Sequence, residues 1–396
     1  MGESIGSSPV AAQARADVAT AGEADSVAAA SCSLALELTY SCNQTCAYCY
    51  NPSRSAASAA VATPRGPGEP PTALLLDRLR RVARAWRLGH VTLTGGEPLR
   101  HPGLFPVLGL LRELAIRPQI ITNGTLVSDE VAQRLRSHQV SAVQVTLNGP
   151  TAALHREHVG RDSFDEARRG VRSLLRHGVP VTGCTVVTRR NAEHVGAIID
   201  GWRALGVRRI ALSRFSPAGV SLASMRAWLA RRRDLIAAFR QAQVHAQDGL
   251  DVYCTVPVPA CLMDTAEFAP VRFGQCAIGS TQQEFALGPD GRLRLCTLHG
   301  GHLAGGRDVL DESWDLGAIP RSTEVCGYRG RLPEFCQGCG AAPACLGGCG
   351  ASQLYRDDGA PRALDPLVEQ YFASSGEPST HCDKNHPTRL ELTHDR

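Results

Sequence analysis

Three cysteines lie within eight residues of one another near the N-terminal end of the sequence. Cys42, Cys46 and Cys49 have the spacing C-x3-C-x2-C and follow a β-prone run at Leu34–Thr39. Three thiolates so close together can hold three irons of a [4Fe-4S] cubane and leave the fourth iron open to a small chelating ligand. A zinc site is the alternative, although structural zinc usually takes four protein ligands and no fourth Cys or His lies nearby. The spacing therefore favours an iron–sulfur cluster.

A second motif stands at the end of the next β-prone run, His90–Thr94, which leads into Gly95-Gly96-Glu97-Pro98. Glycines at a strand end allow close approach of the backbone to a ligand, and a glutamate can bind an amino group. Alone, this motif could be a simple turn. Joined to the C-x3-C-x2-C motif in the loop before it, it makes roughly residues 32–220 resemble the radical S-adenosylmethionine (radical SAM) enzymes.

This resemblance implies that Cys42, Cys46 and Cys49 are catalytic and bind a [4Fe-4S] cluster whose open iron chelates S-adenosylmethionine (SAM). One electron would then cleave SAM to a 5′-deoxyadenosyl radical, which abstracts a hydrogen atom from the substrate. The resemblance also implies contacts with SAM. Tyr48 matches the position that contacts adenine, and the residues that match the remaining contacts are Gly95, Gly96, Glu97, Thr122, Asn123 and Asn148.

Two of these positions have an alternative interpretation. Asn123-Gly124 and Asn148-Gly149 could be plain turns, because Asn-Gly favours turns in any protein. Many relatives have Asp-Gly where this chain has Asn148-Gly149. Arg214, at the end of the sixth β-prone run, would point to the mouth of a barrel. There it could pair with a carboxylate of SAM or of the substrate.

A second group of cysteines lies beyond residue 270. Their spacing, C-x9–15-G-x4-C, C-x2-C-x5-C-x3-C and a trailing cysteine, resembles the SPASM domain, an extension of many radical SAM enzymes. The resemblance implies two auxiliary [4Fe-4S] clusters, and therefore three clusters in all. Cys276, Cys296 and Cys349 would hold the nearer auxiliary cluster, and the farther one would be held by Cys336, Cys339, Cys345 and Cys382.

The fourth ligand of the nearer cluster is not fixed by the spacing. Cys261 is the first choice and Cys326 the second, and an iron open to substrate is the third possibility. A zinc ribbon is an alternative for the whole group, because C-x2-C and C-x3-C pairs can hold zinc. Cys32, Cys184 and Cys254 remain. Each could be a small buried hydrophobic residue or a hydrogen-atom donor to a substrate radical.

Composition limits the class of protein. The chain has 396 residues, of which 43% are hydrophobic and 20% are charged, and a net charge of +4. It has no apolar run long enough for a membrane helix and no export signal, so we expect a cytoplasmic protein and no membrane partner. The small charge gives no reason to expect nucleic acid binding. In a reducing compartment, 15 cysteines indicate metal ligands or catalytic groups more than disulfides.

The elements that must position these residues alternate between strands and helices, which predicts an α/β fold with a parallel sheet. Six such units fit either a partial barrel or an open doubly wound sheet, and the family resemblance implies a partial (β/α)6 TIM-type barrel. The expected strands are Leu34–Thr39, His90–Thr94, Gln119–Thr122, Ala142–Leu147, Val181–Val187 and Arg209–Phe215. The expected helices include Ala73–Trp86, Phe105–Leu114, Asp129–Ser137, Phe164–His177 and Asn191–Leu205, the last with Asn191 as its N-cap.

The expected domain boundaries follow from this alternation. They give a disordered tail at 1–31, a radical SAM core at 32–220, a bridging helical segment at 221–252 and a small, irregular SPASM domain at 253–396. One helical stretch is expected at Ser221–Gln247. A hairpin is expected where Gln283–Leu287 and Leu293–Cys296 flank Gly-Pro-Asp-Gly.

The leading functional hypothesis is oxidative modification or crosslinking of a ribosomally synthesised peptide, as many SPASM-bearing relatives perform. The alternative is a radical epimerase or dehydrogenase that acts on a sugar or cyclitol. Sulfatase maturation is less favoured, because Thr297 stands where such relatives have Asp. Expected partners are the substrate and a flavodoxin- or ferredoxin-type electron donor. Because residues 1–31 are too short to form a leader-binding domain, either a separate leader-peptide-binding protein or recognition by the C-terminal domain is expected.

Overall fold

The computed structural model describes residues 31–51, 69–219, 221, 225–350 and 364–375. The expected N-terminal tail up to residue 30, most of the loop after the first cysteine motif, and Cys382 lie outside the described residues. Within the described part, no helix is long and apolar enough to cross a membrane.

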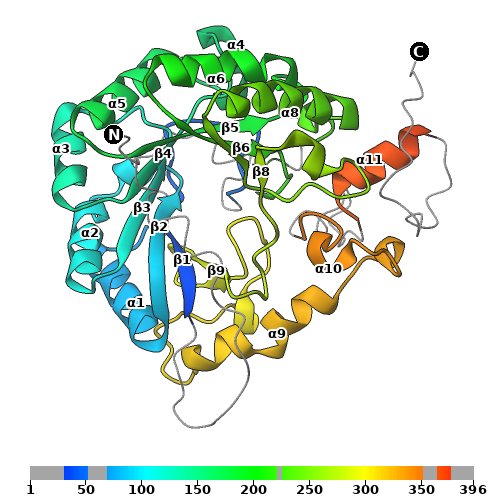
Figure 1. Cartoon of the computed structure of the whole chain (residues 1–396). Helices are drawn as coiled ribbons and strands as arrows, with labels where there is room; N and C mark the ends of the chain where they lie inside the picture. Colours follow the sequence, from blue (N-terminus) through cyan, green and yellow to red (C-terminus); the bar gives the residue numbers. More distant parts are fainter. Residues whose placement is uncertain (1–30, 52–68, 220, 222–224, 351–363, 376–396) are drawn as a thin grey trace, which may run out of the picture.

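A curved parallel sheet forms the centre of the fold, with helices on its outer face (Figure 1). The first six strands pair in chain order, and each one is parallel to the next. They are β1 (Ser31–Thr39), β2 (Arg87–Gly95), β3 (Arg117–Thr122), β4 (Ala142–Thr146), β5 (Val181–Val187) and β6 (Arg209–Arg214). The predicted α/β fold with a partial barrel is therefore confirmed.

The helices between these strands pack apolar faces against the sheet. They are α1 (Thr72–Ala85), α2 (Leu104–Glu113), α3 (Asp129–Ser137), α4 (Ala152–Val159), α5 (Phe164–Arg176) and α6 (Val195–Ala204). Helix α4 was missed by the sequence analysis. It has only eight residues, begins after the N-cap Thr151 and ends at Gly160, whose φ of 69° is left-handed. So short a helix carries too little periodicity to be recognised.

The sheet continues beyond residue 220. Strand β7 (Asp251–Cys254) is parallel to β6, and β8 (Arg272–Phe273) is parallel to β7. At the opposite edge, β9 (Glu284–Leu287) is parallel to β1 and pairs with β10 (Leu293–Arg294) in the predicted antiparallel hairpin. Residues that the sequence analysis assigned to the C-terminal domain therefore extend both edges of the barrel sheet.

The expectation of one helix over Ser221–Gln247 is wrong. The structure has α7 (Met225–Trp228) and then α8 (Arg232–Gln247). The Asp234 carboxylate accepts the backbone N–H of Arg231 at 2.8 Å, which caps α8 and begins a new helix there.

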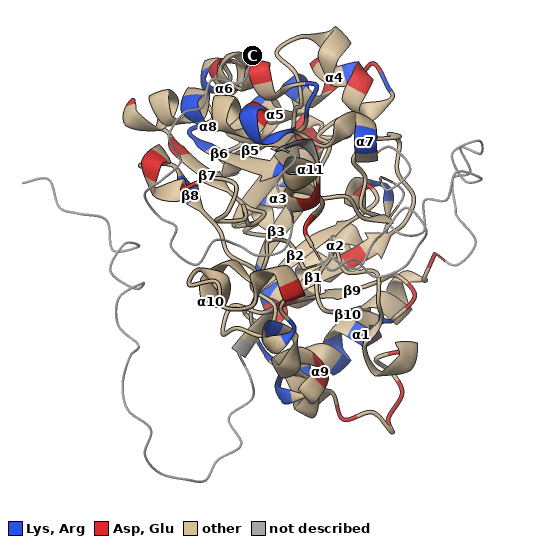
Figure 2. Cartoon of the chain, turned by 90° about the vertical axis from the view of Figure 1, so that its right-hand side faces the viewer, with Lys and Arg blue, Asp and Glu red and all other residues tan. Residues whose placement is uncertain are grey.

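The C-terminal segment consists of short elements along one side of the barrel, where basic and acidic residues are interspersed (Figure 2). Its helices are α9 (Thr323–Cys326), α10 (Ala342–Cys345) and α11 (Pro366–Ser375). Single 3-10 turns occur throughout the chain, at Pro98–Arg100, Ala192–His194, Thr265–Phe268, Leu303–Gly306, Leu316–Arg321, Gly327–Gly330 and Glu334–Cys336.

A fully buried ion pair joins this C-terminal segment to the barrel. The Arg214 guanidinium, at the end of β6, pairs with the Asp365 carboxylate, and both side chains are 0% exposed. Asp365 also accepts the backbone N–H of Cys349 at 2.8 Å and that of Leu367 at 3.0 Å. One carboxylate therefore fixes the start of α11 and the Cys349 loop against the barrel.

A second buried pair does the same at the other edge of the sheet. Glu37 on β1 pairs with Arg294 on β10, and each side chain is 2% exposed. The Arg294 guanidinium also donates to the carbonyl oxygen of Thr297 at 3.1 Å. The loop that carries Cys296 is thereby held beside the strand that precedes the first cysteine motif.

We expect removal of Asp365 to destabilise the fold strongly. Asp365→Ala leaves the Arg214 charge buried without its partner, which should lower the free energy of unfolding by about 3–5 kcal/mol. Glu157→Ala is the matched control, because the Glu157–Arg190 pair is exposed, and the loss there should stay below about 1 kcal/mol. Denaturant unfolding of both variants measures the difference. Equal losses would show that the buried pair contributes no more than a surface pair.

Candidate functional site

The first cysteine motif forms a loop at the carboxyl end of β1. Cys42, Cys46 and Cys49 are half-buried and in no disulfide. The loop is attached to α4 by backbone hydrogen bonds, from Thr45 to Val159 and from Ala47 to His158, each of 2.9 Å. Helix α4, absent from the sequence prediction, is therefore the support that gives this loop its shape.

Side chains strengthen the same attachment. Gln44 is buried, donates to the Ser163 hydroxyl at 2.9 Å and accepts the Cys46 thiol at 3.6 Å. The Ser163 hydroxyl lies 3.4 Å from Nε2 of His155. Burial lowers the pKa of His155 to about 4, so this imidazole is neutral at ordinary pH and serves as a hydrogen-bonding support.

Gly95, the last residue of β2, and Gly96 approach the chain's own backbone. Gly95 has a φ of 120°, and a Cβ on Gly96 would lie 2.1 Å from the carbonyl oxygen of Ser41. The Gly96 and Glu97 N–H groups donate to the Thr39 and Ser41 carbonyls at 2.6 Å and 2.9 Å. These glycines were expected to let the backbone approach a ligand closely. In the structure they let it approach the segment that leads from β1 into the cysteine loop.

Glu97 joins the ends of β2 and β3. Its carboxylate is buried and accepts the Thr122 hydroxyl at 2.7 Å, the Asn123 N–H at 2.8 Å and the Leu99 N–H at 3.1 Å. Burial raises the pKa of Glu97, and these three hydrogen bonds oppose that shift. Much of the accepting capacity of Glu97 is thus used within the chain, to hold Thr122 and Asn123 in place.

From Asn123 the network reaches the cysteine loop. The Asn123 amide donates to Oδ1 of Asn43 at 2.7 Å and lies 4.0 Å from the Cys42 sulfur. Asn43 in turn donates to the Thr125 hydroxyl at 2.8 Å. The sequence analysis missed Asn43, Gln44 and Thr125. Polar residues between the cysteines were the available signal for the first two.

Tyr48 and Asn148 also lie together. The Asn148 amide donates to the Tyr48 hydroxyl at 2.7 Å and accepts the Val186 N–H at 2.8 Å. Asn191 was expected as an N-cap, and its side chain makes no capping hydrogen bond. The Asn191 amide donates instead to the Asn148 carbonyl oxygen at 3.0 Å. Asn148 is fully buried and orients Tyr48 next to Cys46.

Arg214 requires a correction. It was expected to offer its guanidinium to a carboxylate of SAM or of the substrate at the barrel mouth. The structure places it 1% exposed, with the guanidinium bound to Asp365 and to the carbonyl oxygen of Pro257. The sequence could not show this, because Asp365 lies 151 residues further along the chain.

The structure brings the C-terminal cysteines into two groups. In the first, Cys276, Cys296 and Cys349 lie close enough for each thiolate to disfavour ionisation of a neighbour. Burial raises the pKa of Cys296 to about 12, and its two neighbours add to the shift. Nearby, Tyr328 lies within electrostatic range of all three sulfurs.

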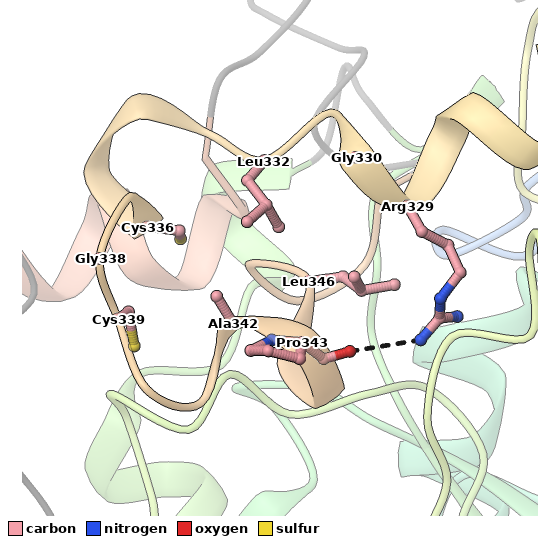
Figure 3. Close-up of a pocket in the computed structure, with 9 residues that line it drawn as sticks. All are labelled: Arg329, Gly330, Leu332, Cys336, Gly338, Cys339, Ala342, Pro343 and Leu346. Carbon is pink, nitrogen blue, oxygen red and sulfur yellow. Dashed lines mark hydrogen bonds between the residues drawn. The ribbon is translucent and has the colours of Figure 1, made fainter.

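The second group contains Cys336, Cys339 and Cys345. The Cys345 and Cys339 sulfurs lie close enough to Cys336 to disfavour its ionisation. Cys336 and Cys339 line a pocket of about 530 Å³ (Figure 3). The other lining residues are Arg329, Gly330, Leu332, Gly338, Ala342, Pro343 and Leu346. The backbone N–H of Ala260 donates to the Cys345 sulfur at 3.4 Å, so the segment that carries Cys261 runs beside this second group. Cys326 is exposed.

These donor sets suit iron–sulfur clusters. The three groups offer cysteine sulfur, which is the usual ligand of [4Fe-4S] clusters. Within the described ranges, no three His, Cys, Asp or Glu side chains lie close enough together to hold a single metal ion.

Comparison with known proteins shows which superfamily the barrel resembles. Residues 36–200 match the model of the radical SAM superfamily. Mycofactocin maturase MftC of Mycobacterium tuberculosis is 30% identical over 190 residues, which are 47% of this chain and 45% of that protein. The match thus spans a little under half the length of that relative. PqqA peptide cyclase of Gluconobacter oxydans is 26% identical over 319 residues, 78% of this chain and 82% of that protein.

The fold is also that of a solved structure. Streptococcus suis SuiB bound to the precursor peptide SuiA superposes with a TM-score of 0.63 at 16% identity, covering 85% of this chain and 75% of that one.

We expect Gly96→Ala to disrupt the cysteine loop. The new methyl group would overlap the Ser41 carbonyl, and overpacking of this kind costs about 1–3 kcal/mol. Gly89→Ala is the control on β2, the strand that precedes Gly96, because a Cβ there meets no atom within 4 Å. Gly96→Ala should lower both the unfolding free energy and the iron bound after anaerobic reconstitution, whereas Gly89→Ala should leave both close to wild type. Full iron loading of Gly96→Ala would refute this account of the glycines.

Proposed function

We propose that this chain, whose residues 36–200 match the radical SAM superfamily, oxidatively modifies or crosslinks a ribosomally synthesised peptide. The observation that carries the proposal is the loop of Cys42, Cys46 and Cys49, held at the carboxyl ends of the barrel strands by β2 and α4. In the radical SAM family, a [4Fe-4S] cluster and SAM together supply a 5′-deoxyadenosyl radical that removes a hydrogen atom from the substrate.

The chain's own residues would organise that chemistry. Cys42, Cys46 and Cys49 would hold the cluster, and Glu97 would keep Asn123 beside Cys42. Tyr48, oriented by Asn148, would contact SAM. Gly95 and Gly96 are fixed by their close approach to Thr39 and Ser41, and Thr122 by its hydrogen bond to Glu97. We retain Gly95, Gly96 and Thr122 as residues that would border SAM.

The C-terminal segment, which we place at about 253–396, would carry two auxiliary clusters. Its two cysteine groups support this proposal. The match to PqqA peptide cyclase adds to it, because 319 aligned residues must extend beyond 36–200 into the cysteine-rich part. Such clusters would accept the electron released when the substrate radical is oxidised. A flavodoxin- or ferredoxin-type donor and a separate leader-peptide-binding protein remain our proposed partners.

A peptide is the proposed substrate because of the similar proteins. One is named a maturase and another a peptide cyclase, and SuiB was solved with a precursor peptide bound. The second candidate is the epimerase, and one observation favours it. Burial raises the pKa of Cys184 to about 12, and this protonated thiol lies near Tyr48, where it could return a hydrogen atom to a substrate radical.

Replacement of Cys42, Cys46 and Cys49 by Ala should abolish the formation of 5′-deoxyadenosine. Iron should fall from about 12 to about 8 per chain, because a [4Fe-4S] cluster carries four irons and only the barrel cluster would be lost. Gly89→Ala is the control, since a Cβ there meets no atom within 4 Å, and it should keep both iron and activity. Iron, sulfide and zinc analysis together with product chromatography measure the result. Stoichiometric zinc, or wild-type iron in the triple variant, would contradict the proposal.

The product should be two hydrogens lighter than the substrate, with one SAM consumed per turnover. This follows if the substrate radical loses an electron and a proton to close a crosslink or double bond. Mass spectrometry in ordinary and in deuterated water measures it, with Cys184→Ala as a comparison that should keep the oxidation. An unchanged mass in ordinary water, with one deuterium gained in deuterated water and lost in Cys184→Ala, would instead establish epimerisation.

A further inference from the structure

The hydroxyl group of Tyr328 is buried and has no hydrogen-bond partner among the described residues. Tyr328 lies in the 3-10 turn Gly327–Gly330, directly after α9. A buried tyrosine hydroxyl normally finds a partner, because a buried donor without one loses free energy that water would supply. The position of this hydroxyl therefore requires an explanation.

The groups around the hydroxyl are the first set of C-terminal cysteines. Cys276, Cys349 and Cys296 each disfavour ionisation of Tyr328. Gly350 directly follows Cys349, and a Cβ there would lie only 1.6 Å from the Tyr328 oxygen. The hydroxyl thus lies against the backbone next to Cys349, at a point where no larger residue fits.

Neighbouring contacts hold the ring in this position. The Arg329 guanidinium donates to the carbonyl oxygens of Cys276 at 3.1 Å and Ile278 at 3.3 Å, so the turn is fastened to the Cys276 segment. The His299 ring packs edge-on against Tyr328, with centroids 6.3 Å apart. Contacts from both sides therefore fix the hydroxyl near the three sulfurs.

We propose that Tyr328 donates a hydrogen bond to the cluster held by Cys276, Cys296 and Cys349 and thereby raises its reduction potential. This inference rests on the auxiliary cluster of the proposed function. Cluster sulfurs are acceptors, and a phenol supplies the complementary donor. Hydrogen bonds to cluster sulfur stabilise the reduced state, which carries more negative charge. A tyrosine hydroxyl has an ordinary pKa of about 10, so at neutral pH it carries the proton that such a hydrogen bond needs.

The test compares Tyr328→Phe with Tyr253→Phe in the full-length chain. Tyr253→Phe is the matched control, because it also removes one tyrosine hydroxyl. Tyr253 lies on β7, where its ring contacts Arg209 and Arg272. Both substitutions are made in wild type and in the Cys42, Cys46 and Cys49 to Ala background, which removes the barrel cluster from the spectra. Iron and sulfide are counted first. EPR-monitored redox titration then gives the midpoint potential, and pulsed EPR in deuterated water detects exchangeable protons coupled to the cluster.

Tyr328→Phe should keep its iron, shift the midpoint potential of one auxiliary cluster to a more negative value and lose one coupled exchangeable proton. Tyr253→Phe should change none of these. An unchanged potential with the proton coupling retained would overturn the role of Tyr328 and leave the proposed function standing. If the wild-type protein binds iron for only one cluster, the auxiliary cluster does not exist, and that part of the proposed function is wrong.

If Tyr328→Phe does not retain the cluster, wild-type protein labelled with 3,5-difluorotyrosine gives a second test. The labelled hydroxyl is more acidic and a stronger donor, so the midpoint potential should rise. No shift in the labelled protein would overturn the inference.

Discussion

The cysteine loop depends on a close backbone contact between the ends of β1 and β2. Gly95 and Gly96 lie so near the carbonyls of Thr39 and Ser41 that neither can carry a side chain without displacing the chain. This contact determines where the loop leaves β1, and Glu97 then extends the constraint to β3. The positions of Cys42, Asn123 and SAM in our account all follow from this one junction.

The first C-terminal cysteine group is fixed to the barrel by buried ion pairs as well as by a shared apolar core. Asp365 joins Arg214 on the barrel to the Cys349 backbone, and Glu37 joins β1 to the hairpin that precedes Cys296. Buried pairs of this kind are specific in direction and costly to break. Because β9 also pairs with β1, the hairpin that leads to Cys296 belongs to the barrel sheet. This connection would hold the proposed clusters at a fixed separation.

Much of the barrel could be predicted from the sequence, because its strands are β-rich runs separated by periodic helices. The short helix α4 could not, because eight residues make little more than two helical turns, and neither could β7 and β8, which have four and two residues. The cysteine spacing indicated both regions that we propose to bind iron–sulfur clusters. It gave no information on Asp365 as the partner of Arg214 or on Tyr328, because these contacts join segments far apart in the chain and depend on tertiary packing.

The central claim is that SAM binds at the barrel cluster and at no other. The most direct measurement is pulsed EPR of the reduced, fully loaded enzyme with SAM labelled with ¹⁵N at its methionine amino group. Our account predicts nitrogen coupling to one cluster only, and complete loss of that coupling when Cys42, Cys46 and Cys49 are replaced by Ala. Coupling that persists in this variant, or that belongs to a cluster held by Cys276, Cys296 and Cys349, would contradict it.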